Sequence, residues 1–211
     1  MSRIVSTAVD TAVAEAADAL QRGELIAIPT ETVYGLAVLP NEAGLSRLLA
    51  AKQRSTEKGI QLLVDSLAHV EELAVLTRSA AVLADTFWPG GLTLVLRRRD
   101  DVVVPAALSG GRPTVGLRLP DHEVPRALAR LLGPLAASSA NISGEPDATT
   151  AQRVAESLGA EVDLIVDDGP VRGGTPSTVV DCSDPDAQPR ILREGAITAD
   201  AIEDALRSGL H

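Results

Sequence analysis

The chain has 211 residues, of which 45% are hydrophobic, so it can build one sizeable domain with a true core and is not mostly disordered. Its formal net charge of −10 argues against a protein that grips long nucleic acid, although it permits a small basic pocket. The single cysteine excludes an intramolecular disulfide; an acidic N-terminal segment and the lack of an apolar run of about 18 residues predict a cytoplasmic protein without a membrane span.

Helical and strand patterns alternate along the chain. Apolar spacing predicts helices at residues 7–22, 66–75, 78–87 and 122–132, and further helices that start at caps on Asn41, Thr149 and Thr198 and end near 52, 158 and 207. Short apolar runs predict strands at 25–28, 60–64, 114–120, 134–140, 163–168, 177–182 and 189–194, and one after the break at 88–91. We therefore expect one α/β domain with a mixed sheet over 1–211, comprising a core at about 7–197 and a C-terminal helix at 198–211.

The stretch "IPTETVYGLA" (28–37) places two threonines, a glutamate and the only tyrosine directly after a predicted strand. Such a polar cluster is unusual in a chain with three aromatic residues. We expect Pro29 to end the strand, Gly35 to let the chain turn away, and Tyr34 to pack with its hydroxyl tied to a partner.

The only two lysines, Lys52 and Lys58, flank Arg54 in "KQRSTEK". Three cations in seven residues are as consistent with a solvated turn at a helix end as with a polyphosphate site. Polar residues end apolar segments at five places: "PTET", "VGLRLPDH", "AASSANISG", "STVVDC" and "ILREG". Each is ordinary alone, but their recurrence indicates a shared pocket at strand ends, where open α/β sheets bind ligands.

Seven blocks in order resemble the YrdC-like family of threonylcarbamoyl-AMP synthases and cover most of the chain. They are "PTETVYGLA", "KQRSTEKGIQLLV", "WPGGLTLVL", "VGLRLPDH", "PLAASSANISGEP", "STVVD" and "ILREGAI". The resemblance implies a twisted mixed sheet, flanked by helices, around a deep basic cavity. It also implies a nucleotidyltransferase that condenses L-threonine, bicarbonate and ATP into L-threonylcarbamoyl-adenylate and pyrophosphate, the first step toward N6-threonylcarbamoyladenosine at tRNA position 37.

The resemblance also implies site residues, matched position by position. Lys52 and Arg54 would act electrostatically, without a covalent nucleophile. The L-threonine site would comprise Thr32, Arg118, Ala137 and Ser177. The ATP site would comprise Arg54, Lys58, Thr114, Ser139, Asn141, Asp147 and Arg193. No protein metal ligand is implied, since Mg²⁺ would be held by the ATP phosphates, and no organic cofactor is expected. A downstream tRNA threonylcarbamoyl-transferase complex would be the partner, without stable binding to bulk nucleic acid or membrane.

Three departures from the family pattern affect these expectations. Ser55 stands where proline is usual, and Leu63 stands where some relatives have a histidine, so no histidine role is assumed. The chain is also expected to lack the extra C-terminal domain of longer members. Rival interpretations are a paralogue of this fold with another nucleotide or carbamoyl substrate, and a non-catalytic RNA-binding protein.

Overall fold

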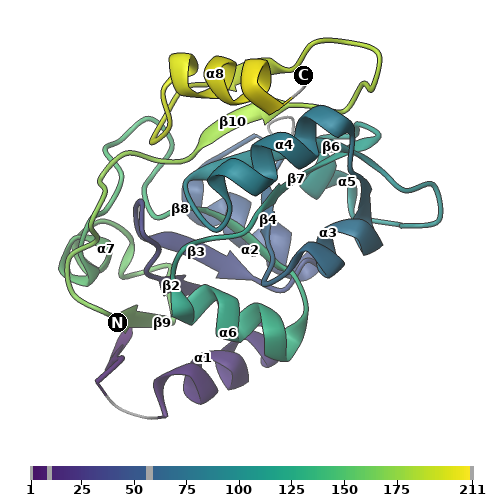
Figure 1. The fold of residues 1–211 in the computed structure, drawn as a ribbon. Helices are drawn as coiled ribbons and strands as arrows, with labels where there is room; N and C mark the ends of the chain where they lie inside the picture. Colours follow the sequence, from purple (N-terminus) through teal and green to yellow (C-terminus); the bar gives the residue numbers. More distant parts are fainter. Residues whose placement is uncertain (1, 9–10, 56–58, 210–211) are drawn as a thin grey trace.

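The computed structural model describes residues 2–8, 11–55 and 59–209, and in them one mixed sheet runs through the molecule (Figure 1). The strands are β1 (Arg3–Ser6), β2 (Ile26–Ile28), β3 (Gly35–Val38), β4 (Gln61–Leu63), β5 (Ala74–Val75), β6 (Leu92–Arg98), β7 (Thr114–Arg118), β8 (Leu135–Ser139), β9 (Leu164–Asp167), β10 (Thr178–Asp181) and β11 (Arg190–Arg193). The helices are α1 (Ala12–Gln21), α2 (Glu42–Lys52), α3 (Leu67–Leu73), α4 (Arg78–Phe87), α5 (Ala106–Ser109), α6 (Glu123–Leu132), α7 (Ala151–Leu158) and α8 (Ala199–Gly209).

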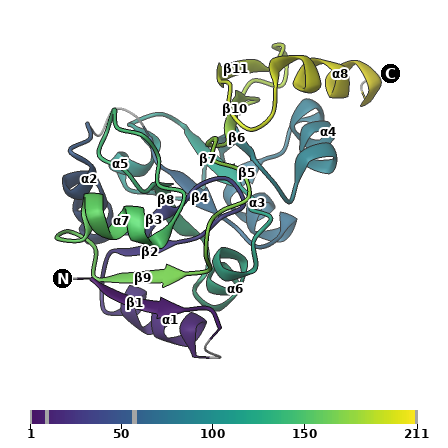
Figure 2. The same cartoon turned by 90° about the vertical axis from the view of Figure 1, so that its left-hand side faces the viewer.

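The strand order is β1-β9-β2-β3-β8-β4-β7-β6-β10-β11, with β5 paired to β6. Strand β9 pairs in parallel with β1 and β2, β4 with β7, and β6 with β10, whereas the other pairs are antiparallel. The prediction of an α/β fold with a mixed sheet is confirmed. Figure 2 shows β10, β11 and α8 at one end of the molecule and β1 and α1 at the other.

One face of the sheet is covered along most of its length. Helices α2, α4 and α7 bury Leu45, Leu83 and Val154 in the same cluster as Leu62 of β4 and Leu94 of β6. Each fully buried leucine or valine contributes about 1.5–3 kcal/mol relative to exposure. Because this cluster also includes Ile165 of β9 and Val180 of β10, near the two ends of the sheet, it holds the scaffold together beneath the opposite face.

The opposite face is covered over only part of the sheet. Helices α1 and α6 pack Leu20 and Leu128 against Ile26, Leu63 and Leu135 of β2, β4 and β8. No residue of β6, β7 or β10 belongs to this second cluster among the described residues. The face is therefore open over the β7–β6–β10 half of the sheet.

Most predicted elements are confirmed, and three details are wrong. The cap of α7 is Thr150, whose side chain accepts a hydrogen bond from Arg153 N, rather than Thr149. The helix predicted at 7–22 begins only at Ala12, and the strand β1 that precedes it at Arg3–Ser6 was not predicted. Gly35 does not turn the chain away but begins β3, which is buried along its whole length and so lacks the alternation that marks a half-exposed strand. Within the described residues, no helix combines the length and apolarity needed to cross a membrane.

Candidate active site

A cavity of about 780 Å³ lies on the open part of the sheet. Every second residue of a strand faces the cavity. Its floor therefore includes Thr93 and Val95 of β6 and Gly116 and Arg118 of β7. A methyl group on Gly116 would lie 3.6 Å from Thr93 Cγ2 and 3.7 Å from Gln61. Small and polar residues thus keep open a space that larger apolar residues would fill.

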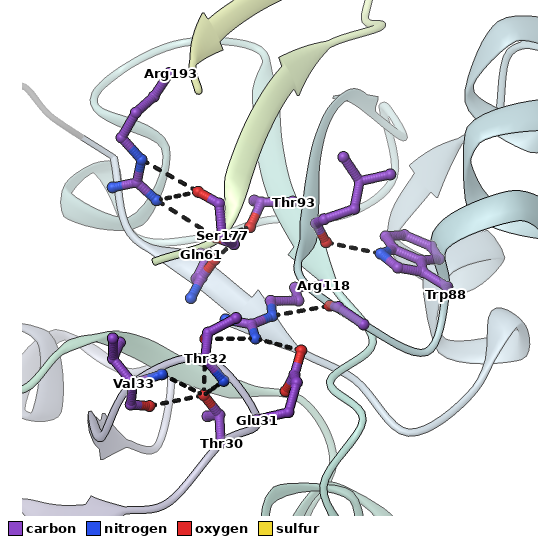
Figure 3. A network of polar contacts seen from close by, with 12 residues as sticks. Thr30, Glu31, Thr32, Val33, Gln61, Trp88, Thr93, Arg118, Ser177 and Arg193 are labelled. Carbon is purple, nitrogen blue, oxygen red and sulfur yellow. Dashed lines mark hydrogen bonds and ion pairs between the residues drawn. The ribbon is translucent and has the colours of Figure 1, made fainter. Parts of the chain in front are cut away.

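Arg118 projects from the end of β7 and is almost completely buried, with 3% of its side chain exposed. Its Nη2 donates to Glu31 Oε1 at 2.7 Å and to Thr32 Oγ1 at 2.8 Å, and its Nε donates to Gly90 O at 3.2 Å (Figure 3). The Glu31 carboxylate offsets the cost of burying this cation, which unpaired would be several kcal/mol. The guanidinium is therefore fixed before any ligand binds.

The turn between β2 and β3 presents Thr32 to Arg118. Thr30 organises it: its hydroxyl donates to Val33 O at 2.7 Å and accepts the backbone N–H groups of Thr32 and Val33. Because the Thr30 proton is used in this way, Thr32 donates to Thr30 Oγ1 at 2.9 Å while it accepts from Arg118. The two threonines thus aim one hydroxyl oxygen at the guanidinium.

A chain of hydrogen bonds crosses the floor from β11 to β4 (Figure 3). Arg193 donates to Ser177 O at 2.7 Å and approaches Ser177 Oγ at 3.4 Å. Thr93 Oγ1 donates to Gln61 Oε1 at 2.7 Å, so the 2.8 Å contact between Thr93 and Ser177 is donated by Ser177. The Ser177 oxygen therefore keeps acceptor capacity for a ligand N–H or O–H group.

Arginines dominate the charge of the cavity. Arg54 donates to Ser138 Oγ and to Gly59 O, both at 3.0 Å. Burial lowers the pKa of Arg54 and of Arg193, and the charge of Arg193 lowers the pKa of Arg54 further. The described lining contains five arginines and one carboxylate, namely Arg54, Arg112, Arg118, Arg190, Arg193 and Asp181. Such a cavity attracts a polyanion, even in a chain of net charge −10.

Lys52 holds the loop that follows β8. Its ammonium donates to Ser139 O at 2.5 Å and to both Asn141 O and Asn141 Oδ1 at 2.8 Å. Burial, with a contribution from Arg54, lowers the pKa of Lys52 to about 8, so that the amine is still mostly protonated at pH 7 and can make all three bonds. Ser139 Oγ also donates to Asn141 Oδ1 at 2.7 Å. The lysine therefore fixes the loop through its ammonium group.

Residues 18–195 match the Sua5/YciO/YrdC family, which carries the description "telomere recombination". The chain belongs to this family. It is 41% identical over 191 residues to threonylcarbamoyl-AMP synthase of Pyrococcus abyssi and 40% identical over 197 residues to that of Bacillus subtilis.

These alignments cover 89% and 92% of this chain but 55% and 56% of the relatives, so the chain spans a little over half their length. The structure of P. abyssi Sua5 complexed with L-threonine superposes with a TM-score of 0.88 and 37% identity. That match covers 97% of this chain and 60% of the other. The family membership thus rests on both sequence and fold.

The structure brings together most of the residues that the sequence predicts for the site. Seven of them line the cavity: Arg54, Thr114, Arg118, Ala137, Ser139, Ser177 and Arg193. Thr32, Lys52, Asn141 and Asp147 are not part of the lining. The first three stand behind it and orient lining groups, while the charge of Asp147 acts on Lys52 and Arg193. Lys58 lies outside the described residues.

Sequence reasoning gave no site role to four residues that the structure places in or beside the site. Glu31 pairs with Arg118, Gln61 and Thr93 carry the floor hydrogen bonds, and Asp181 lines the cavity. Glu31 could have been found, because a buried arginine on a strand requires a carboxylate partner. Gln61, Thr93 and Asp181 could not, since strand alternation shows that they share a face only once the strand order is known.

Proposed function

We propose that the protein is a threonylcarbamoyl-AMP synthase, a nucleotidyltransferase that condenses L-threonine, bicarbonate and ATP into L-threonylcarbamoyl-adenylate and pyrophosphate. The observation that carries the proposal is one cavity in which a preformed Arg118–Thr32–Ser177 set lies beside an arginine-rich wall. The Arg118–Thr32–Ser177 set is suited to an amino acid, and the arginine-rich wall is suited to a triphosphate. The named activity of the P. abyssi and B. subtilis relatives supports the same function.

On the amino-acid side, we assign the carboxylate of L-threonine to Arg118. Two of the guanidinium nitrogens already have partners, and those contacts leave Nη1 as the donor for the ligand. Ser177 Oγ would accept from the amine or the hydroxyl, with Thr32 and the backbone at Ala137 completing the subsite. The superposed P. abyssi protein is in complex with L-threonine, which supports an amino-acid subsite in this fold.

The reaction proceeds by two bond-forming steps. The neutral amine of threonine attacks the carbon of bicarbonate. An N–C bond forms, water is lost, and the product is a carbamate. A carbamate oxygen then attacks the α-phosphorus of ATP, and the bond from that phosphorus to the bridging oxygen breaks to release pyrophosphate. The nucleophile belongs to the substrate, so the protein contributes orientation, worth up to roughly 7–11 kcal/mol, and positive charge against the phosphates.

On the nucleotide side, we assign Arg54 and Arg193 to the phosphates, with Thr114, Ser139 and the predicted Lys58 as further contacts and Asn141 positioned behind Ser139. Burial lowers the pKa of both arginines, and Arg193 lies close enough for its charge to lower the pKa of Arg54 as well. An anion placed between them would relieve this repulsion. Lys52 would position Ser139 and Asn141 and would add positive charge behind the phosphates.

In the part of the chain that the structure describes, no group of three or more His, Cys, Asp or Glu side chains that could hold a metal ion occurs. Mg²⁺ commonly binds through substrate phosphates with few protein ligands. The ion would therefore arrive as part of the substrate, MgATP. A downstream enzyme that transfers the threonylcarbamoyl group to tRNA would consume the product.

The test is to incubate the purified protein with MgATP, bicarbonate and L-threonine and to measure both products. We expect pyrophosphate release that requires threonine, together with the threonylcarbamoyl-adenylate by mass spectrometry. Equal pyrophosphate release without threonine, or no adenylate product, would refute the proposed function.

A paired variant tests the amino-acid subsite. Arg118→Ala should weaken threonine binding by at least tenfold, as expected for a charge-assisted hydrogen bond, and should change ATP binding much less. Arg130→Ala is the matched control, because Arg130 is exposed and pairs with Asp65 and Glu123 away from the cavity. Equal losses of threonine and ATP affinity in Arg118→Ala would contradict the assignment.

A further inference from the structure

The cavity changes character along β10. Ser177, Val179 and Asp181 all line it, at alternate positions of the strand, and Asp181 is roughly 13 Å beyond Ser177 at about 3.3 Å per residue. The parallel register places Val179 beside Thr93 and Asp181 beside Val95. The cavity therefore runs from the Ser177 end, past two valines, to a carboxylate.

Asp181 is held in a defined orientation. Its Oδ1 accepts from Ser183 N at 3.0 Å and from Ser183 Oγ at 2.7 Å. Its Oδ2 lies 3.7 Å from Arg190 Nη2, beyond hydrogen-bond distance. A quarter of the side chain is exposed, so a ligand in the cavity can reach it. One carboxylate oxygen is thus fixed by the protein while the other keeps acceptor capacity.

A carboxylate is an unexpected group in this lining, because its charge opposes the binding of a polyanion. It has a use where a ligand presents hydrogen-bond donors. A nucleoside triphosphate presents such donors as the ribose hydroxyls, at the end of the molecule away from the γ-phosphate. Acidic side chains hold ribose hydroxyls in the same way in dinucleotide-binding folds.

We propose that Asp181, held by Ser183, is a specificity-determining residue that accepts a hydrogen bond from the ribose 2′-hydroxyl of the nucleotide. The inference rests on the proposed function only in that a nucleotide occupies the cavity. The triphosphate then lies toward Arg54 and Arg193, and the ribose lies past Val95 and Val179 at the Asp181 end.

The opposite orientation makes a different prediction. Arg112 and Arg190 also line the cavity, and phosphates placed near them would be repelled by Asp181. Removal of the Asp181 charge would then tighten the binding of every nucleotide equally. Removal of a ribose contact would instead weaken the binding of ATP and leave that of 2′-deoxy-ATP little changed.

The experiment measures the binding of ATP and 2′-deoxy-ATP by calorimetry, and product formation from each, for the wild-type protein and three variants. Asp181→Asn keeps the shape and should lower the preference for ATP over 2′-deoxy-ATP about fivefold. Asp181→Ala should lower it by roughly tenfold or more. Asp184→Asn is the control, because Asp184 is exposed on the same loop and its carboxylate accepts from the backbone of Asp186. It should leave the preference unchanged.

Each outcome supports or overturns the ribose contact, the proposed function, or both. An unchanged preference in both Asp181 variants, or tighter binding of both nucleotides, overturns the inference, while adenylate formation by the wild-type protein keeps the proposed function. Loss of the preference without any adenylate product supports a ribose site and refutes the synthase. Absence of binding of either nucleotide to the wild-type protein overturns both.

Discussion

Gly195 offers a test of how the backbone positions Ser177. A Cβ atom at residue 195 would lie 2.2 Å from Pro176 O and 2.7 Å from both the carbonyl carbon and oxygen of Ser177. These are backbone atoms, which cannot rotate away as a flexible side chain can. Gly195→Ala therefore requires the segment that carries Ser177 to move.

The size of the movement follows from the contact distances. Ordinary contact begins at 3.4 Å and the closest approach is 2.2 Å, so the difference is 3.4 − 2.2 = 1.2 Å. Overpacking of this kind costs about 1–3 kcal/mol of folding free energy. A displacement of about 1 Å in a group that orients a substrate lowers turnover by roughly a hundredfold. The hydrogen bonds of Ser177 with Thr93 and Arg193 would lengthen by a comparable amount.

The assay compares threonine-dependent product formation and thermal unfolding of Gly195→Ala with those of the wild-type protein and of Glu194→Ala. The control truncates the exposed neighbouring side chain and adds no atom beside Ser177. We expect Gly195→Ala to lose roughly a hundredfold in kcat/KM for threonine, and about 4–8 °C in melting temperature for a loss near 2 kcal/mol. If Gly195→Ala shows wild-type kinetics, the close approach of residue 195 to the Pro176–Ser177 backbone does not determine the position of Ser177.

Three further predictions concern buried polar groups. Tyr34→Phe removes the donor to Gly169 O at 2.8 Å and should destabilise the fold by about 1–3 kcal/mol in urea unfolding. Burial raises the pKa of Cys182 from 9.0 to about 12, so the unfolded chain releases this proton first. The free energy of unfolding should then fall between pH 9 and 12, and should fall less in Cys182→Ala. The pKa of Lys52 is lowered from 10.5 to about 8, so the folded state releases its proton first, and stability should rise over this range relative to Lys52→Met.

Sequence patterns recovered the secondary structure where local chemistry decides it. Asn41 does cap α2, accepting from Gly44 N, and Tyr34 does pack in the core with its hydroxyl tied to Gly169 O. The strand β3 escaped prediction because it is central and buried, so its four residues show no alternation. Alternation of polar and apolar residues is informative only where one face meets solvent.

The sequence predicts which strand-end residues belong to the site, but not which of them line the cavity and which position other groups. The sequence identifies Arg54, Arg118, Ser139 and Ser177 as candidates, and the structure brings all four to one cavity. It cannot reveal that Lys52 has its ammonium turned toward the backbone of the 139–141 loop. That outcome depends on β8 lying next to β3 and β4 in the sheet, which is a non-local pairing.

The Glu31–Arg118 pair explains how a basic site can persist in the folded protein without its anionic ligand. A buried arginine alone would destabilise the fold by several kcal/mol, and that cost would fall on the state that must receive substrate. Glu31 removes most of this cost at one edge of the guanidinium and leaves Nη1 outside the pair. A ligand carboxylate then meets a donor that is already oriented, so less binding energy is spent on ordering the site. Under the proposed function, the glutamate of the "PTET" turn would act on the substrate through Arg118, which accounts for an acidic residue beside the proposed amino-acid subsite of an arginine-rich cavity.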